Sequence, residues 1–228
     1  MTPGERALLR DASAHVLVAD PAAPDLADDV AHHLFRVLRL RDGEVVTLTD
    51  GRGRWCPARV ADGAVVTDGE LRVEAPPESP LTIAVAIPKR DRPDWIVQKL
   101  TELGVPRIVL LHTERSVVRW DADRAAKHVA KLGRVAVEAL QQSRGVWLPE
   151  IEGPVDAREV LPSAVVAEPG GRELSPDDRV VAVGPEGGWS ADELAHARDH
   201  VAIGPTILRV ETAAIVIAAR ELAHVKYY

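Results

Sequence analysis

The chain has 228 residues, 46% of them hydrophobic, which is enough for one large domain or two modest ones. Its single cysteine, Cys56, excludes an intramolecular disulfide and every zinc site that needs paired cysteines, and it indicates a reducing compartment. The N-terminus has no apolar core of signal-peptide length, and the longest apolar run, 213–219, is far too short to cross a bilayer, so we expect a cytoplasmic protein without a membrane partner.

The formal net charge of −7, from 28 Lys and Arg against 35 Asp and Glu, argues against a phosphate-rich partner if the charge is evenly spread. It is not evenly spread. Residues 32–54 carry five basic against three acidic residues, and residues 86–145 carry 12 against seven. Such blocks also occur as solvated faces of helices, so charge alone leaves nucleic-acid binding open.

Residues 1–75 are predicted to form a small antiparallel barrel or sandwich. Short β-branched runs are separated there by four Asp-Gly pairs, at 42–43, 50–51, 62–63 and 68–69. This pair favours hairpin turns because both residues tolerate positive φ. One helix is expected, over residues 24–40, with Val30, Leu34, Val37 and Leu38 on its apolar face. Three prolines within residues 76–80 predict a linker.

Residues 81–228 alternate between strand and helix patterns, which is typical of a mostly parallel α/β sheet. The apolar runs predict strands over 81–87, 107–111, 165–167, 180–183 and 201–203. Helices are expected over 94–103, 121–143 and 212–224, with a further helix that opens at Ser190 through a capping box to Glu193.

Several familiar sites lack their parts. There is no phosphate-binding P-loop and no nucleophile elbow, and Gly51-Arg52-Gly53 is a hairpin turn rather than a dinucleotide fingerprint because the third glycine is missing. His196 and His200 have i, i+4 spacing on a predicted helix, but no third ligand lies near them, so an exposed helix face is the favoured interpretation and no metal is expected.

Three loops are candidates for a ligand site. Gly184-Pro185-Glu186-Gly187-Gly188 follows a buried strand and precedes a capped helix, where glycines let a ligand approach the backbone; a tight strand-to-helix connection explains the same pattern. The loop 203–212 lies between another strand and helix, with Arg209 and Glu211 beside the helix start. Lys89, Arg90 and Arg92 follow a third strand and suggest an anion site or a solvated loop.

These loops belong to an ordered set of motifs that resembles a known family. The motifs are Pro88-Lys89-Arg90-Asp91-Arg92, Gln98-Lys99-x-Thr101-Glu102-Leu103-Gly104-Val105, Glu114-Arg115-Ser116-Val117-Val118, Gln142-Ser143-Arg144, Gly184-Pro185-Glu186-Gly187-Gly188 and Leu208-Arg209-x-Glu211-Thr212-Ala213-Ala214, preceded by His33-Leu34-x-Arg36-Val37-Leu38-Arg39. Their order resembles that of the bacterial 16S ribosomal RNA uracil-N3 methyltransferases, the RsmE type of the SPOUT superfamily.

The resemblance implies a fold and a cofactor. It implies a PUA-like, RNA-binding β-barrel domain over 1–75, a linker over 76–80 and an α/β SPOUT methyltransferase domain with a trefoil knot over 81–228. It also implies a homodimer, and S-adenosylmethionine as the cofactor. The residues expected to hold that cofactor are Ala167, Glu168, Gly184, Pro185, Glu186, Gly187, Gly188, Ile203, Gly204, Ile207, Leu208, Arg209, Thr212 and Ala213.

The implied reaction needs in-line positioning of two substrates and removal of a proton from uracil N3, but no metal and no covalent intermediate. Because N3 lies on the Watson-Crick edge, the base must be unpaired. Candidates for catalysis are Arg209, Glu211, Arg144 and Glu138, with the two glutamates as possible bases; candidates for binding the 16S ribosomal RNA of the small subunit are Arg36, Arg39, Lys89, Arg90, Arg92, Arg115 and Arg144. Each of the candidate catalytic residues and of Arg92 and Arg115 alternatively forms a structural ion pair.

The sequence departs from the family pattern at Gln141, where a Glu often stands, at Gly145, which follows Arg144 instead of preceding it, and at Val210, which replaces a Thr and is expected in the core. Gln141 cannot act as a base, and no cofactor-loop glycine is lost. Two alternative functions stay open: a non-catalytic RNA-binding or ribosome-assembly protein, and a SPOUT methyltransferase with another RNA target.

Overall fold

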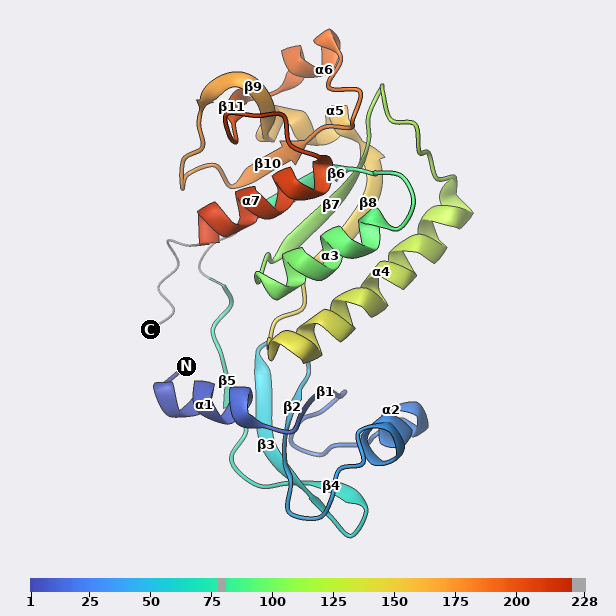
Figure 1. Cartoon of the computed structure of the whole chain (residues 1–228), viewed down its shortest axis with the longest axis vertical. Helices are drawn as coiled ribbons and strands as arrows, with labels where there is room; N and C mark the ends of the chain where they lie inside the picture. Colours follow the sequence, from blue (N-terminus) through green and yellow to red (C-terminus); the bar gives the residue numbers. More distant parts are fainter. Residues whose placement is uncertain (78–80, 223–228) are drawn as a thin grey trace. The chain divides into compact units, whose positions relative to one another are not determined.

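The computed structural model describes residues 1–77 and 81–222 and forms two compact units (Figure 1). Unit 1 consists of Met1–Pro76 together with Leu140–Leu148, and unit 2 consists of Pro77–Ala139 and the described residues from Pro149 onward. Residues 78–80 of the predicted linker lie outside the described residues. The sequence had assigned Leu140–Leu148 to the C-terminal domain, whereas their contacts place them with the N-terminal unit.

Unit 1 is built on a small sheet in which the strands follow the order β1-β2-β3-β4, with β5 also paired to β3. The strands are β1 (Ala14–Leu17), β2 (Val45–Thr49), β3 (Arg54–Ala61), β4 (Ala64–Thr67) and β5 (Arg72–Val73). The prediction of an all-antiparallel sheet is wrong at one edge, because β1 pairs with β2 in parallel. The long connection between these two strands carries the chain back to the same end of the sheet, as a parallel pair requires.

Two of the four Asp-Gly pairs form the predicted hairpins. Asp50-Gly51 connects β2 to β3 and Asp62-Gly63 connects β3 to β4, both in antiparallel register. Asp42-Gly43 instead precedes β2, and Asp68-Gly69 leads from β4 to β5, which both pair with β3. A turn dipeptide therefore marks where the chain reverses but does not show which strands then pair.

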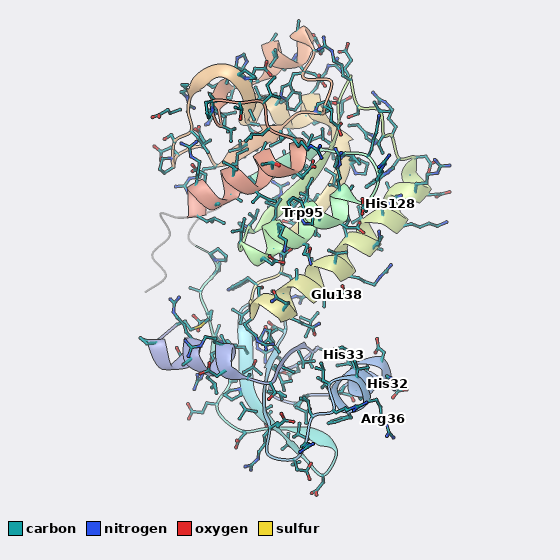
Figure 2. All side chains as sticks on the ribbon, in the orientation of Figure 1. His32, His33, Arg36, Trp95, His128 and Glu138 are labelled. Carbon is teal, nitrogen blue, oxygen red and sulfur yellow. The ribbon has the colours of Figure 1, made fainter. Side chains whose placement is uncertain are left out.

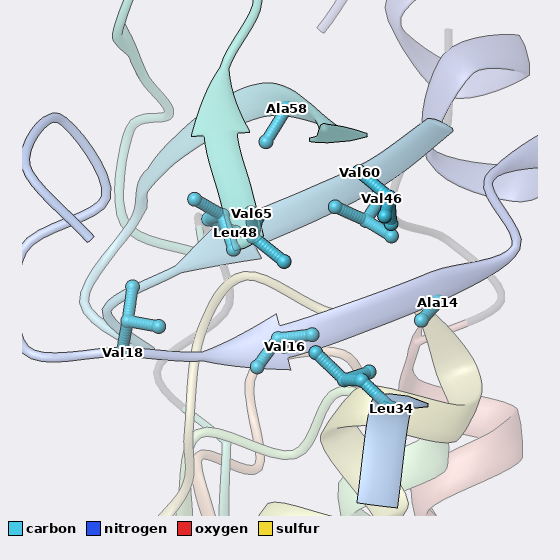
Figure 3. Packing of buried hydrophobic residues seen from close by; sticks show 9 residues of the cluster. All are labelled: Ala14, Val16, Val18, Leu34, Val46, Leu48, Ala58, Val60 and Val65. Carbon is cyan, nitrogen blue, oxygen red and sulfur yellow. The ribbon is translucent and has the colours of Figure 1, made fainter. Parts of the chain in front are cut away.

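The helical parts of unit 1 differ most from expectation. The predicted helix over 24–40 is shorter, with α2 (Asp28–His32) followed by a π-helix, η1 (His33–Val37). Leu34 joins the core shown in Figure 3, but Val37 and Leu38 are exposed because the wider π-turn breaks the 3.6-residue period. Helix α1 (Pro3–Asp11) was not predicted, although its capping box between Thr2 and Glu5 is readable in the sequence.

The segment Leu140–Leu148 is joined to the rest of unit 1 by several hydrogen bonds. The ring of His15, which is buried, contacts Thr47 Oγ1 through Nδ1 and the Gly145 carbonyl through Nε2, both at 2.7 Å. Backbone bonds join Gly53 to Val146 and Leu148 to Gly51, at 2.8 Å each. The Gln141 side chain, at a position where the family often has Glu, accepts a hydrogen bond from the Leu17 amide at 3.0 Å. The segment thus completes the core of unit 1.

Unit 2 is a six-stranded parallel sheet in the order β11-β9-β10-β6-β7-β8, which confirms the predicted α/β class. Its strands are β6 (Thr82–Ala86), β7 (Arg107–His112), β8 (Glu150–Asp156), β9 (Val165–Glu173), β10 (Val180–Val183) and β11 (Asp199–Ala202). The apolar runs predicted all of them except β8, whose Gly153-Pro154 pair reads as a loop.

Helices cover both faces of this sheet (Figure 1). Helix α7 (Val210–Leu222) packs against α3 (Arg92–Glu102) and against strands β6 and β10. The other face packs on α5 (Ala157–Val160), the 3-10 turn η2 (Leu161–Ser163) and α6 (Ala191–His196). Helix α4 (Ala122–Ser143) begins in unit 2, and its last residues, from Leu140, belong to unit 1.

Three further expectations are settled by these elements. Helix α6 ends at His196, and His200 lies in β11, so the predicted helical pair of histidines is wrong. Val210 is buried as predicted. The C-terminal helix begins two residues before Thr212, and residues 223–224 of its predicted span lie outside the described residues.

The trefoil knot stays a prediction. No helix in the described part of the chain is long and apolar enough to span a membrane.

Candidate active site

The candidate site lies at the carboxyl edge of the parallel sheet of unit 2. From β6 the strands proceed through β7 to β8 on one side, whereas β9 and β10 return on the other side of β6. The order of strands therefore reverses between β6 and β10, and α/β sheets bind ligands beyond the strand ends at such a switch point. The loop after β6 begins at Ile87, and the loop Gly184–Gly188 follows β10.

One guanidinium joins the predicted site residues at this edge. Arg92 Nη1 donates a hydrogen bond to Glu186 Oε1 at 3.0 Å, and Arg92 Nε lies 3.6 Å from Glu211 Oε1. Arg115, which follows β7, donates from Nη1 to the carbonyl oxygen of Gly187 at 3.2 Å. The structure thus brings together residues from the first turn of α3, from the loops after β7 and β10, and from the first turn of α7. Arg92, Arg115, Glu186 and Glu211 form the arginine–glutamate cluster.

Glu211 carries the clearest electrostatic signal of the cluster. The residue is 8% exposed, and its Oε2 atom is buried without a hydrogen-bond partner among the described residues. A buried carboxylate oxygen without a partner is costly unless something else satisfies it. The atom is therefore available for a ligand or a substrate proton.

Packing explains the first glycine of the loop, but not the others. A Cβ atom on Gly184 would lie 2.8 Å from the indole of Trp189, so the ring of that buried tryptophan requires a glycine there. A Cβ on Gly187 would lie 3.4 Å from the Arg115 Cβ, and Gly188 has a φ of +70°. Gly187 is therefore exposed and would make only ordinary contact with Arg115 if it carried a Cβ, whereas the left-handed backbone explains Gly188.

Glu193 fixes the residues that follow the loop Gly184–Gly188. Its capping motif predicts only part of this role. Its Oε2 atom accepts from the Ser190 amide at 2.9 Å, which completes the predicted capping box. Its Oε1 atom accepts from the Glu114 amide at 2.8 Å, across 79 residues. The capping signal predicted the first bond, whereas the second depends on tertiary structure.

The second predicted cofactor loop, 203–209, leads into α7. Ile207 is 90% exposed, and nothing lies within 4 Å of where a Cβ on Gly204 would stand. The carbonyl of Ile203 accepts a hydrogen bond from Arg220 Nη1 at 3.1 Å. Leu208 and Thr212 are half-buried, Ala213 is buried and Arg209 is exposed. Ala167 pairs in register with Val183, so Ala167 and Glu168 lie one strand away from the loop after β10.

Two candidate catalytic residues are not brought into the cluster. The guanidinium of Arg144 is half-buried within unit 1, where Nη2 donates to the Ala12 carbonyl at 2.9 Å and Nη1 to the Gln141 carbonyl at 3.2 Å. This burial lowers the pKa of Arg144 below its usual range. Glu138 has an exposed side chain on α4 (Figure 2), and the contacts that join the described cluster do not include it.

The remaining basic candidates are exposed. Arg36 lies on η1 close to His32 and His33 (Figure 2), and Arg39 follows it; Lys89 and Arg90 lie in the loop after β6. Arg39, Arg90 and Arg144 adopt left-handed backbone conformations, with φ of 58°, 66° and 62°. Such conformations are uncommon for arginine and concentrate at functional or tightly constrained positions.

Comparison with known proteins gives the class of protein. Residues 75–221 match the model of an RNA methyltransferase domain, and residues 26–64 match that of an RNA methyltransferase PUA domain. Together with the fold, these matches define an RNA methyltransferase in which a PUA domain precedes the catalytic α/β domain.

Relatives give the particular family. The chain is 31% identical over 216 residues to ribosomal RNA small subunit methyltransferase E of Mycobacterium bovis, covering 82% of this chain and 81% of the relative. A structure of ribosomal RNA small subunit methyltransferase E from Neisseria gonorrhoeae bound to S-adenosyl methionine is 30% identical, with a TM-score of 0.73 and coverage of 92% and 97%. A methyltransferase from Legionella pneumophila in complex with the same cofactor is 28% identical, with a TM-score of 0.75 and coverage of 91% and 96%. The chain belongs to the ribosomal RNA small subunit methyltransferase E family, as its motifs predicted.

The residues of this chain fit that cofactor. S-adenosylmethionine carries cationic groups, an adenine ring and hydrogen-bonding ribose hydroxyls. The site offers a buried carboxylate oxygen without a partner on Glu211, the exposed aliphatic side chain of Ile207, and exposed backbone at Gly187 and Gly204. No group of three or more His, Cys, Asp or Glu side chains that could hold a metal ion occurs among the residues described.

Proposed function

We propose that the protein transfers the methyl group of S-adenosylmethionine to N3 of a uridine in 16S ribosomal RNA of the small ribosomal subunit. The observation that carries the proposal is the meeting of the Gly184–Gly188 loop and the first turn of α7 around Arg92, at the switch point of the sheet, in a chain of this methyltransferase family.

The cofactor would be held by backbone more than by side chains. The cofactor would approach the backbone at the glycines 187, 188 and 204. The rest of the site would consist of Ala167, Glu168, Gly184, Pro185, Glu186, Ile203, Ile207, Leu208, Arg209, Thr212 and Ala213. When bound, S-adenosylmethionine supplies an electrophilic methyl group. The chain's contribution is to hold the two substrates in line, which in well-oriented intramolecular reactions removes roughly 7–11 kcal/mol of barrier.

Glu211 would act on the proton of uracil N3. Its Oε2 atom has no hydrogen-bond partner among the described residues and can accept the proton, whereas Arg92 lies beside its Oε1 atom. Arg209, two residues earlier and exposed, would stabilise the negative charge that develops on the uracil. Glu138 and Arg144 stay predictions as catalytic residues.

RNA would be bound in an unpaired conformation that exposes the Watson-Crick edge of the target base. Arg36 and Arg39 in unit 1, and Lys89 and Arg90 after β6, are exposed cations suited to phosphate oxygens. In this proposal the enzyme acts as a homodimer in the cytoplasm, where the small subunit is assembled.

Nucleoside mass spectrometry tests this function. Small-subunit RNA from a strain that lacks the gene is incubated with the purified protein and S-adenosylmethionine, and 3-methyluridine is expected to appear at one position. Methylation of another nucleotide would favour the related methyltransferase with a different target. RNA binding without calorimetric binding of S-adenosylmethionine would favour the non-catalytic ribosome-assembly protein.

A further inference from the structure

Two arginines from different loops hold consecutive residues of the glycine loop. Arg92, at the start of α3, donates to the Glu186 carboxylate at 3.0 Å, and Arg115, after β7, donates to the Gly187 carbonyl at 3.2 Å. One contact fixes a side chain of the loop and the other fixes its backbone. The loop 184–188 is therefore restrained on both sides of the peptide bond between residues 186 and 187.

Arg92 also connects this loop to a second element of the site. Its Nη1 atom faces Glu186 and its Nε atom faces Glu211 in the first turn of α7, so two different nitrogens of one planar group are used. A guanidinium can span two carboxylates in this way, whereas a lysine ammonium is a single point of charge on a flexible stem. The geometry thus requires arginine, beyond a mere positive charge.

The loop has few other restraints where the cofactor would bind. Glu186 and Gly187 are exposed, and Gly188 has a left-handed backbone. Glycine-rich backbone loses more conformational entropy on ordering than other backbone does. A restraint that orders the loop before binding removes that cost from the binding free energy.

We infer that Arg92 and Arg115 are positioning residues for the cofactor loop: they hold Glu186 and Gly187, and Arg92 also holds Glu211, in the arrangement that S-adenosylmethionine binds. This inference rests on the proposed function, and it differs from the sequence prediction that both arginines bind RNA. Arg92 has the larger effect, because its loss leaves the buried Glu211 carboxylate without the cation that faces it.

The test separates cofactor affinity from RNA affinity. Isothermal titration of the full-length protein with S-adenosylhomocysteine, the demethylated cofactor, is compared for the unaltered protein, Arg92→Ala, Arg92→Lys and Arg115→Ala. We expect the Kd to rise about tenfold for Arg92→Ala and about threefold for Arg115→Ala. Arg92→Lys should recover only part of the loss, because an ammonium cannot face both carboxylates at the present distances.

Two controls make the outcome specific. Arg134→Ala removes an exposed arginine of helix α4 in the same unit and should leave the Kd unchanged. In the double variant Arg92→Ala/Glu186→Gln, the loss should be smaller than the sum of the single losses, since both changes break the same contact. Circular dichroism melting confirms that each variant is folded at the temperature of the titration.

Steady-state kinetics separate an effect on the KM for S-adenosylmethionine from an effect on the KM for RNA. For Arg92→Ala we expect the KM for S-adenosylmethionine to rise and the KM for RNA to stay within about twofold of its original value. A raised KM for RNA with unchanged cofactor affinity would overturn the inference and support direct phosphate binding by Arg92. Failure of the unaltered protein to bind either form of the cofactor would instead contradict the proposed function itself.

Discussion

The glycine-containing loops of unit 1 and of unit 2 differ in why glycine occurs in them. In unit 1, a Cβ on Gly53 would lie 2.3 Å from the Trp147 ring, and a Cβ on Gly51 would lie 2.7 Å from Leu148. In unit 2, a Cβ on Gly187 would lie 3.4 Å from its nearest neighbour, and one on Gly204 would meet nothing within 4 Å.

The difference shows what separates a packing glycine from a binding glycine. At Gly51 and Gly53 the protein itself fills the space beside the backbone, using the segment Leu140–Leu148. At Gly187 a Cβ would make only ordinary contact with Arg115, at 3.4 Å, and at Gly204 it would meet nothing within 4 Å, so close packing does not account for either glycine. Substitutions should therefore affect stability in the loop of unit 1 and cofactor affinity in the two loops of unit 2.

The largest effect is expected from Gly187→Trp. An indole at this position would collide with Arg115, whose Cβ lies 3.4 Å from where the new Cβ would stand, and would displace the loop 184–188. Methyl transfer should therefore fall by about a thousandfold or more, or ~4 kcal/mol of lost transition-state binding. The measurement is the rate of methylation of small-subunit RNA, together with titration of S-adenosylhomocysteine. Gly133→Trp, on a glycine of α4 with open space around it, is the matched control and should retain cofactor affinity.

Gly53→Ala should destabilise unit 1 by about 3–4 kcal/mol, because the methyl group would overlap the Trp147 ring and the φ of +89° strains any residue other than glycine. Urea unfolding followed by tryptophan fluorescence measures the loss. Gly43→Ala has the same φ of +89° with nothing within 4 Å, so it should cost only about 1 kcal/mol of strain. Equal losses in both variants would contradict the packing explanation for Gly53.

The packed loop should also respond to pH through His15, which binds the same segment at Gly145. Burial lowers the pKa of His15 from 6.5 to about 4. Above pH 6.5 both the folded and unfolded states hold it neutral; as the pH falls from 6.5 toward 4, only the unfolded state takes up the proton. The free energy of unfolding should therefore fall by about 3 kcal/mol over this range.

Urea unfolding at pH 7, 5.5 and 4.5 checks the His15 effect against His15→Gln, which cannot titrate. That variant should be less stable at pH 7, because the Thr47 and Gly145 bonds are altered, yet it should lose less stability on acidification. A pH dependence identical to that of the unaltered protein would show that other groups cause the acid sensitivity.

The smallest effect is expected from Gly204→Ala. With open space around the position and no left-handed backbone, stability should change by less than about 0.5 kcal/mol. The Kd for S-adenosylhomocysteine should rise about threefold if the cofactor uses this space. Unchanged affinity would remove Gly204 from the cofactor site while leaving Gly187 and Gly188 in it.

The sequence predicted most of the sheet of unit 2, because buried parallel strands are continuous apolar runs. It missed β8, which contains Gly153-Pro154, and it ended β9 at Ala167, before Pro169 and two glycines. In unit 1 it missed the parallel pairing of β1 with β2, since strand order depends on contacts between distant residues. Local sequence patterns predict where helices and strands occur, whereas the pairing of strands depends on contacts across the whole chain.

The sequence predicted which residues form the site but not the contacts between them. The loop at Gly184–Gly188, Arg92, Arg115 and Glu211 were all singled out from motifs, and the structure joins them. That Arg92 would face two carboxylates, or that Glu193 would bind the Glu114 amide 79 residues away, has no local signal. Arg144 is the opposite case, since its motif predicted a place in the site. The structure instead shows it bonded to the Ala12 and Gln141 carbonyls in unit 1.

The membership of Leu140–Leu148 in unit 1 has a consequence for folding during synthesis. When Pro76 leaves the ribosome, the N-terminal unit still lacks the partners of His15, Gly51 and Gly53. At ~5–20 residues per second, the missing segment follows several seconds later, after β6, α3, β7 and most of α4 have been made. The N-terminal unit therefore completes its fold only after β6, α3, β7 and most of α4 have emerged, so the two units overlap in time instead of folding strictly one after the other.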